Sequence, residues 1–345
     1  MDATASFNDK TVLVTGANGF IGNCTARAFA RAGWKTYGLV RSEASIAYLE
    51  RSEIVPILGS ASDLIFLDTD PALREVAFDI IVSTTENLSD YLPHFTDTVS
   101  LLQAVSRRAK QRTGKKPLVL FSSGCKDYGT TALHGSAELH AHTETSPLQP
   151  AFFIKPRTEN AMQLLEHEEL FHTAVLRPTT VYGLSGSYYA LFFERAEAAR
   201  SEHGGVIRIA QRKKSIVHGT HGDDVGEAYL ALATHAVMHG TTDIHGQCFN
   251  ISGRKYEVLE DIVAALVREY GLAGVEWLGE DVEVIDWTQP REIDADAVLL
   301  GFSQWVGSQK IRDLTGWCDR RMSFQDGLRV YRKSFEAFRD SKSRI

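Results

Sequence analysis

Short apolar runs alternate with longer stretches of helical periodicity over residues 11–182 of the chain. Each run is rich in β-branched residues and has the length of one strand, and parallel strands need a crossover, usually a helix, between them. The pattern therefore predicts a parallel sheet with helices between its strands. The six expected strands are Thr11–Thr15, Lys35–Val40, Ile54–Leu58, Asp79–Ser83, Pro117–Ser122 and Thr173–Leu176.

One of the expected crossover helices has a continuous apolar face. Its apolar residues recur at spacings of three and four, which places them on one side of a helix. They are Leu88, Tyr91, Leu92, Phe95, Val99, Leu102 and Val105. Pro93 falls in the first turns, where proline is tolerated.

The pattern changes beyond Gly183 to longer helices with isolated strands, which indicates a smaller C-terminal lobe. We expect strands at Val206–Ile209 and Cys248–Ile251 and a helix over Leu259–Tyr270 in this part of the chain. The sheet domain is predicted to span residues 1–183, with segments at about 216–250 and 302–313 returning to it. The lobe takes about 184–215, 251–301 and 314–345, and a polar loop over 132–150 has the length of a lid or substrate loop.

Composition and charge narrow the class of protein. The 345 residues are 43% apolar and 23% charged, which is ordinary for a globular protein and argues against disorder. The net charge of −7 does not favour nucleic acid or an anionic membrane as a partner. The first ten residues lack a signal peptide, and four scattered cysteines without a CxxC pair predict a reducing, cytoplasmic location without a metal site.

The first predicted strand leads directly into a glycine-rich turn, Thr15-Gly16-Ala17-Asn18-Gly19-Phe20-Ile21-Gly22, followed by a helix-favouring segment. In this order, Gly16 allows the tight turn, Gly19 lets the backbone approach a pyrophosphate, and Gly22 allows close packing of helix on strand. The context of strand, turn and helix predicts a dinucleotide site.

The end of the second strand bears on which dinucleotide is bound. Sites for NAD place Asp or Glu there to bind the ribose 2′-hydroxyl, whereas this chain has Val40-Arg41-Ser42. Arg41 can pair with a 2′-phosphate, so NADP(H) is the predicted cofactor, unless Arg41 is only a solvated surface residue.

Several motifs follow one another along the chain: TGANGFIG, FSSGCKDYG, IKPRTEN, LRPTTVYG, HGDDV, FNISG, LTGW and FQDGL. In this order they resemble the extended short-chain dehydrogenase/reductase superfamily, in particular its epimerase/dehydratase group. The resemblance implies an α/β fold, a doubly wound parallel sheet of Rossmann type with a smaller C-terminal α/β lobe for the substrate. It also implies cofactor contacts from Gly16, Asn18, Gly19, Phe20, Ile21, Gly22, Arg41, Ser60, Ala61, Thr84, Ser122, Lys155, Pro178 and Val181.

The catalytic residues of that superfamily are only partly present. The resemblance implies a Ser after the fifth strand and a Tyr four residues before a Lys, with the Tyr exchanging a proton with the substrate oxygen. Lys155 matches the Lys, but Ala151 stands at the Tyr position and Gly124 at the Ser position. The Asp that the superfamily carries after the third strand is replaced by Ser60.

A substitute acid is therefore expected near the fifth strand. Tyr128, with Lys126 near enough in sequence to lower its pKa, is the nearest candidate, although the superfamily often carries Tyr-Gly here for packing. Lys126 is also similar to a Lys in progesterone 5β-reductase-like enzymes, whose Tyr would fall at Phe153. The predicted substrate pocket contains Gly124, Cys125, Tyr182, Ser187 and Tyr188.

The sequence favours an atypical NADP(H)-dependent reductase of a small carbonyl or conjugated substrate, of the kind found in secondary metabolism. Two alternatives stay open: a non-redox isomerase, lyase or cyclase on the same fold, and a non-catalytic NADP(H) sensor. By analogy with such folds, a homodimer would form through the helices expected at Leu88–Arg112 and Phe152–Glu169.

Overall fold

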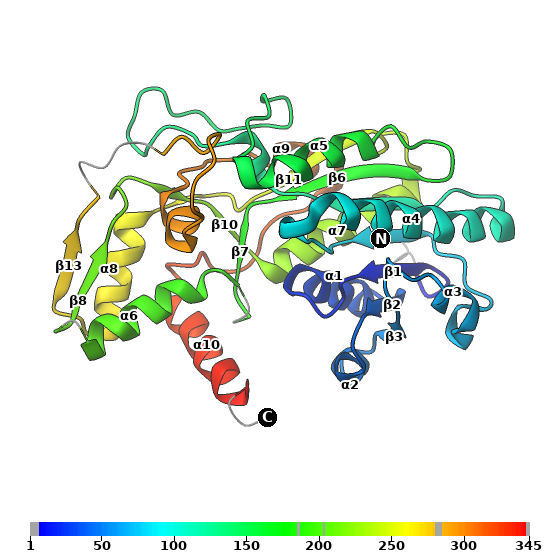
Figure 1. The fold of residues 1–345 in the computed structure, drawn as a ribbon, viewed down its shortest axis with the longest axis horizontal. Coiled ribbons are helices and arrows are strands. Elements are labelled where there is room, and N and C mark those ends of the chain that lie inside the picture. The colour runs from blue at the N-terminus through cyan, green and yellow to red at the C-terminus, as the bar shows by residue number, and fades with distance from the viewer. Residues whose placement is uncertain (1–6, 185–186, 203, 280–284, 343–345) are drawn as a thin grey trace, which may run out of the picture.

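The computed structural model describes residues 7–184, 187–202, 204–279 and 285–342. Its central element is a seven-stranded parallel sheet in the order β11-β6-β5-β4-β1-β2-β3 (Figure 1). The strands are β1 (Thr11–Thr15), β2 (Lys35–Val40), β3 (Val55–Leu58), β4 (Ile80–Ser83), β5 (Leu118–Ser122), β6 (His172–Pro178) and β11 (Gln247–Ile251). This confirms the predicted doubly wound Rossmann-type sheet.

The six strands predicted in the N-terminal half are all present, with ends that differ by no more than two residues. The seventh strand, β11, lies in the central sheet, because it pairs in parallel with β6. The strand pattern alone had grouped Cys248–Ile251 with the strands of the lobe, although the segment at about 216–250 was expected to return to the sheet domain. The grouping with the lobe was wrong, because a short apolar run does not show by itself which sheet it joins.

Helices cover both faces of the sheet, and their apolar faces supply two buried clusters of side chains. On one face, α1 (Phe20–Arg31) and α7 (Gly222–His239) pack through Phe29, Tyr229 and Leu232. On the other face, α4 (Tyr91–Thr113) and α5 (Lys155–Leu164) pack through Leu102 and Leu164. Shorter helices α2 (Ile46–Glu50), α3 (Phe66–Thr69) and α9 (Gln309–Thr315) complete this part.

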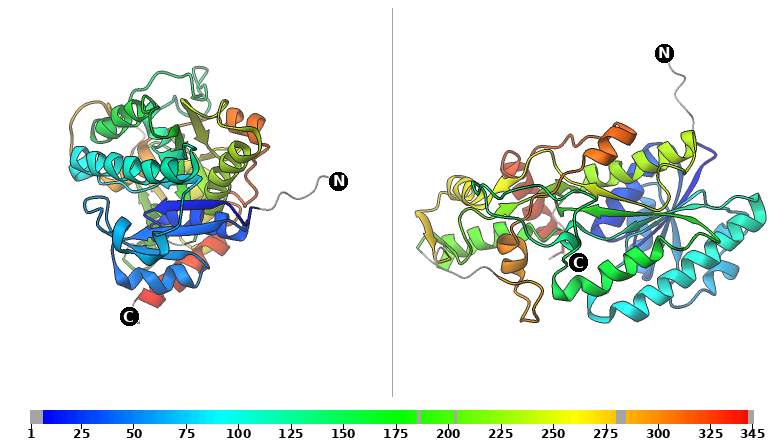
Figure 2. Two further views of the ribbon diagram at one scale, coloured as in Figure 1. Left: turned by 90° about the vertical axis from the view of Figure 1, so that its right-hand side faces the viewer. Right: turned by 90° about the horizontal axis from the view of Figure 1, so that it is seen from above.

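The C-terminal lobe lies at the other end of an elongated molecule (Figure 2). Its core gathers aromatic side chains from α6 (Ala190–Glu202), α8 (Leu259–Tyr270) and α10 (Leu328–Lys342). Three two-stranded pairs accompany these helices: β7 (Thr180–Tyr182) with β10 (Gly219–His221), β9 (Ile216–Val217) with β12 (Glu257–Val258), and β8 (Val206–Ile209) with β13 (Gly274–Trp277).

The order of the strands fixes where a ligand can bind. Strands β1 and β4 are neighbours in the sheet, and the chain runs outward from them in opposite directions. In open α/β sheets this switch point forms a crevice at the carboxyl ends of the strands. Among the described helices, none is long and apolar enough to cross a membrane.

Candidate functional site

The glycine turn after β1 leaves its backbone open to a ligand. Gly16 has φ +66°, a left-handed conformation that favours glycine. A Cβ on Gly22 would lie 2.1 Å from the carbonyl oxygen of Gly16, so only glycine fits against the turn. Gly19 is the N-cap of α1 and no side chain caps it, which leaves backbone N–H groups for a phosphate.

Side chains around the turn hold it in place. Thr84, just after β4, donates its hydroxyl hydrogen to the carbonyl oxygen of Thr15 at 2.6 Å. Asn18 donates from Nδ2 to Ser45 Oγ at 3.0 Å. Phe20 and Ile21 are partly buried against the core on the α1 side. The structure therefore gathers the predicted cofactor residues of this region around one rigid turn.

A cavity of about 340 Å³ lies at the ends of β2 and β3. It is lined by Arg41, Leu58, Gly59, Ser60, Asp63, Ile65, Phe66 and Thr69. Ser60 Oγ lies 2.8 Å from Ser62 Oγ, and Ala61 packs against the neighbouring apolar cluster. Arg41 is exposed and has no hydrogen bond or ion pair with any residue that the structure describes.

The turn and this cavity fit a dinucleotide. The glycine cradle would be blocked by a side chain at position 22, and its uncapped helix end suits a pyrophosphate. Arg41 and Ser60 would face the adenosine ribose from strands β2 and β3. The residues present therefore suit a nicotinamide cofactor at this edge of the sheet.

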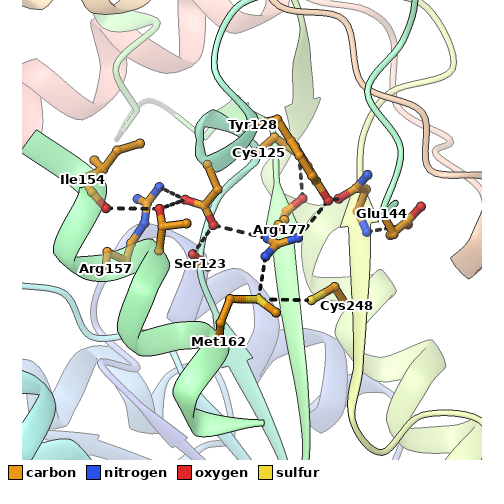
Figure 3. Close-up of polar contacts among 12 residues, drawn as sticks. Ser123, Cys125, Tyr128, Glu144, Ile154, Arg157, Met162, Arg177 and Cys248 are labelled. Atoms are coloured by element: carbon orange, nitrogen blue, oxygen red, sulfur yellow. Dashed lines mark hydrogen bonds and ion pairs between the residues drawn. The ribbon is translucent and has the colours of Figure 1, made fainter. Parts of the chain in front are cut away.

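The carboxyl end of β5 carries a buried ionic network centred on Asp127, and Figure 3 labels its partners Ser123, Arg157 and Arg177. The side chain of Asp127 is fully buried, in a short helical turn over Cys125–Tyr128. Arg157 Nη2 donates to Asp127 Oδ1 at 2.7 Å, and Arg177 Nε donates to Asp127 Oδ2 at 3.2 Å. Hydroxyl groups complete the shell, since Ser123 donates at 2.6 Å and Thr158 at 2.9 Å.

Arg157 connects this network to the crevice. It stands in the first turn of α5, and its Nη1 donates to Glu86 Oε1 at 3.1 Å. Glu86 follows β4 and its side chain is 40% exposed. Burial opposes the charge on Arg157, but Asp127 and Glu86 outweigh it and raise the pKa of the guanidinium. Arg157 therefore stays charged.

The structure separates Lys126 from the hydroxyl of Tyr128. Tyr128 is buried, donates to Asn250 Oδ1 at 2.8 Å and accepts from Arg177 Nη1 at 2.9 Å. Burial raises the pKa of Tyr128, and Arg177 only partly opposes that rise. This corrects the expectation that Lys126 lowers the pKa of Tyr128.

Lys126 points instead to the segment that contains Val298 and Phe302. Its Nζ donates to the carbonyl oxygen of Val298 at 3.0 Å and lies 3.9 Å from the ring centroid of Phe302. Burial, with the nearby charge of Arg157, lowers the pKa of Lys126 to about 7. Lys126 is thus a group near this site that can exchange a proton at neutral pH.

Lys155 and Ala151 lie at the start of α5 in different surroundings. The side chain of Lys155 is 63% exposed, and its Nζ lies 3.8 Å from Glu159 Oε1. Ala151 is fully buried in an apolar cluster with Trp287 and Phe302.

Most of the other predicted cofactor and substrate residues are buried or form hydrogen bonds within the protein. Ser122 Oγ lies 2.6 Å from the hydroxyl of Tyr229, and Pro178 and Val181 are buried at the end of β6 and in β7. The Cys125 thiol is buried and donates to the carbonyl oxygen of Arg177. Tyr182 is buried in the lobe core and donates to the carbonyl oxygen of Met322.

The remaining substrate candidates lie near the lobe junction. Ser187 Oγ accepts from the backbone N–H of Tyr189, while Tyr188 is 72% exposed. A second cavity, of about 260 Å³, opens between the polar loop and the lobe. It is lined by Thr130, Thr131, Ala132, Leu133, Ala210, Gln211, Arg212, Ser215, Gly279, Ile285, Trp287, Gly301 and Ser303.

Sequence reasoning missed Glu86, Asp127 and Arg157. Two of them stand inside motifs that were recognised, Asp127 in FSSGCKDYG and Arg157 in IKPRTEN. Two features of the sequence could have drawn attention to them. Each motif contains a charged residue, Asp127 or Arg157, and the first motif has a glycine without a side chain at position 124.

Solved structures of similar fold include an epimerase and a dehydratase, both with bound NAD. The UDP-glucose-4-epimerase of Stenotrophomonas maltophila with bound NAD has a TM-score of 0.70 and 15% identity, covering 96% of this chain and 99% of that one. The dTDP-glucose 4,6-dehydratase of Bacillus anthracis, in complex with NAD, has a TM-score of 0.69 and 16% identity, covering 95% and 97%. At this identity the likeness shows the fold.

The amino-acid sequence itself gives the family. No curated protein matches the chain significantly. Residues 12–251, which include the glycine turn, the β5 motif and β11, match the NAD dependent epimerase/dehydratase family. The match spans more than half of the chain, and the chain therefore belongs to the NAD dependent epimerase/dehydratase family.

Proposed function

We propose that this protein is an NADP(H)-dependent reductase of a small carbonyl or conjugated organic substrate. The cofactor, when bound, supplies the hydride. The glycine turn and the N-terminus of α1 hold its pyrophosphate, and Arg41 binds the 2′-phosphate from the cavity at the ends of β2 and β3. Membership of the family and the NAD bound in two structural neighbours support a nicotinamide cofactor.

The observation that carries the proposal is the position of Lys126, whose Nζ lies over the ring of Phe302 and donates to the carbonyl oxygen of Val298. Delivery of a hydride leaves negative charge on the substrate oxygen, and a proton must follow. Lys126 has a pKa of about 7, because burial and the charge of Arg157 disfavour its ammonium form. It can therefore give up a proton at neutral pH, which the buried hydroxyl of Tyr128 cannot.

The loss of a tyrosine at position 151 supports a reaction other than that of the sugar-nucleotide enzymes. Ala151 is fully buried in the cluster with Trp287 and Phe302, and alanine has no hydroxyl to offer a substrate. Lys126 lies over the ring of Phe302, which belongs to the same cluster. The proton donor in this protein is thus proposed to come from the β5 loop and not from α5.

The test is to follow cofactor and substrate together. Purified protein is incubated with NADPH and a panel of small aldehydes, ketones, oxo acids and enones, and both NADPH absorbance and product formation are recorded. Oxidation of NADPH with a reduced product supports the proposal. A converted substrate with unchanged NADPH would favour a non-redox isomerase, lyase or cyclase, and bound NADPH without any conversion would favour a sensor.

Arg41→Ala is expected to weaken NADPH binding by about 1–3 kcal/mol, the value of charge-assisted hydrogen bonds, and to leave NADH affinity nearly unchanged. Calorimetric titration of both cofactors measures this. Arg74→Ala, which removes another exposed arginine, is the control and should alter neither affinity. Equal affinity of the unaltered protein for NADPH and NADH would show that Arg41 does not select the cofactor.

Lys155→Met is expected to weaken cofactor binding by about 1–2 kcal/mol, because the exposed ammonium at the start of α5 is proposed to bond the nicotinamide ribose. Lys115→Met provides a matched control, since Lys115 is exposed and lies just before β5, at the amino end of that strand and away from the proposed site. An unchanged affinity in Lys155→Met would remove Lys155 from the site.

A further inference from the structure

Arg157 occupies the space that a side chain at position 124 would need. A Cβ built on Gly124 would lie 3.2 Å from Arg157 Nη2, tighter than an ordinary contact. The guanidinium therefore packs directly on the backbone of Gly124, and a side chain at this position would require Arg157 to shift.

The guanidinium of Arg157 forms ion pairs with two carboxylates, the buried Asp127 and the partly exposed Glu86. Asp127 is fully buried and shared with Arg177, so it balances only one of the two guanidinium groups. The second balancing charge comes from Glu86, whose side chain is 40% exposed. Lys126 adds a further, partly ionised cation beside Arg157. An anion entering the crevice can replace Glu86 without breaking the buried network.

This ion pair lies beside the glycine turn. Glu86 directly follows Thr85, whose Cγ2 lies 3.0 Å from the position of a Cβ on Gly16. Glu86 also extends from β4, the strand next to β1 at the switch point of the sheet. Arg157 thus faces the edge of the sheet where the proposed cofactor would present its reactive ring.

We propose that Arg157 binds the carboxylate of the substrate, with Glu86 acting as an internal placeholder that the substrate displaces. The substrate class is then a small oxo acid or unsaturated acid. The reason is chemical: a guanidinium held on one side by Asp127 offers a planar pair of donors that matches a carboxylate. This inference rests on the proposed function, because it names the substrate of that same site.

The test uses oxamate, a stable analogue of a small oxo acid, and its neutral methyl ester. NADP⁺ binding is first measured by calorimetry, and oxamate is then titrated into the NADP⁺-saturated protein and, separately, into the free protein. Oxamate is expected to bind and methyl oxamate is not. Arg157→Gln should weaken oxamate binding by about tenfold or more, the value of a charge-assisted pair.

Glu86→Gln is the decisive variant, because it changes an exposed side chain and does not endanger folding. Removal of the placeholder should tighten oxamate binding by about two- to fivefold, the value of a partly exposed ion pair. Asp90→Asn makes the same charge change four residues away on an exposed side chain and should leave oxamate affinity unchanged.

The outcomes separate the two proposals. Failure to bind NADP⁺ would overturn the proposed function, and the titrations on free protein would still decide whether Arg157 holds a carboxylate. NADP⁺ binding without oxamate binding would overturn only the inference about Arg157. The inference also fails if Glu86→Gln does not tighten oxamate binding, or if Asp90→Asn tightens it equally.

Discussion

Lys126→Met is expected to lower the rate of substrate reduction by about 10²–10⁴-fold, the usual contribution of a positioned proton donor. NADPH affinity should be almost unchanged, because Lys126 contacts Val298 and Phe302 and none of the residues around the glycine turn. Single-turnover oxidation of NADPH separates the two effects. A variant that keeps more than half of the normal rate would exclude Lys126 as the donor.

The rate of reduction as a function of pH provides a second test of Lys126 as the proton donor. The donor must carry its proton, so the rate should be constant below the pKa of Lys126, which burial lowers to about 7, and should fall as the pH rises through that value. Lys126→Arg keeps the charge but does not titrate in this range, and its low residual rate should not show that fall.

The variant Tyr128→Phe tests whether Lys126 or Tyr128 is the proton donor. The hydroxyl of Tyr128 lies between Arg177 and Asn250, so its removal should cost about 1–2 kcal/mol of folding stability and change the rate little. A large loss of rate with intact NADPH binding would return the donor role to Tyr128.

The fold could be predicted because its signals are local. The glycines that the turn from Thr15 to Gly22 requires all lie within its eight residues. Each strand of the N-terminal half is a separate apolar run. Arg41 could likewise be proposed as a contact to a 2′-phosphate from the sequence, since it follows directly on the second strand. In these cases the residues that matter are neighbours in the sequence.

The contacts at the carboxyl end of β5 could not be predicted in the same way, because they join distant parts of the chain. Asp127 meets Arg157 thirty residues later and Arg177 fifty residues later. Lys126 acquires its low pKa from burial under the segment that contains Val298 and Phe302. Proximity in sequence suggested that Lys126 acts on Tyr128, whereas in the structure Lys126 contacts Val298 and the hydroxyl of Tyr128 contacts Asn250.

Asp127→Asn is expected to lower the free energy of unfolding by about 3–5 kcal/mol, the cost of removing one partner from a buried ion pair. Asp127 is fully buried and accepts from two guanidinium groups and two hydroxyls, so an amide leaves Arg177 inside the protein without a carboxylate. Urea unfolding measures the loss. Glu159→Gln serves as the control: its exposed pair with Lys155 should contribute less than about 0.5 kcal/mol.

The same substitution should also alter the crevice, because Asp127 holds Arg157 against Gly124. Without that carboxylate the guanidinium keeps only its bond to the exposed Glu86, and oxamate affinity should fall even under conditions in which Asp127→Asn remains folded. A folded variant with normal oxamate affinity would show that Arg157 is positioned by its helix alone. Stability close to that of the unaltered protein would show instead that Tyr128 and Met162, which also contact Arg177, suffice to hold its charge inside the protein.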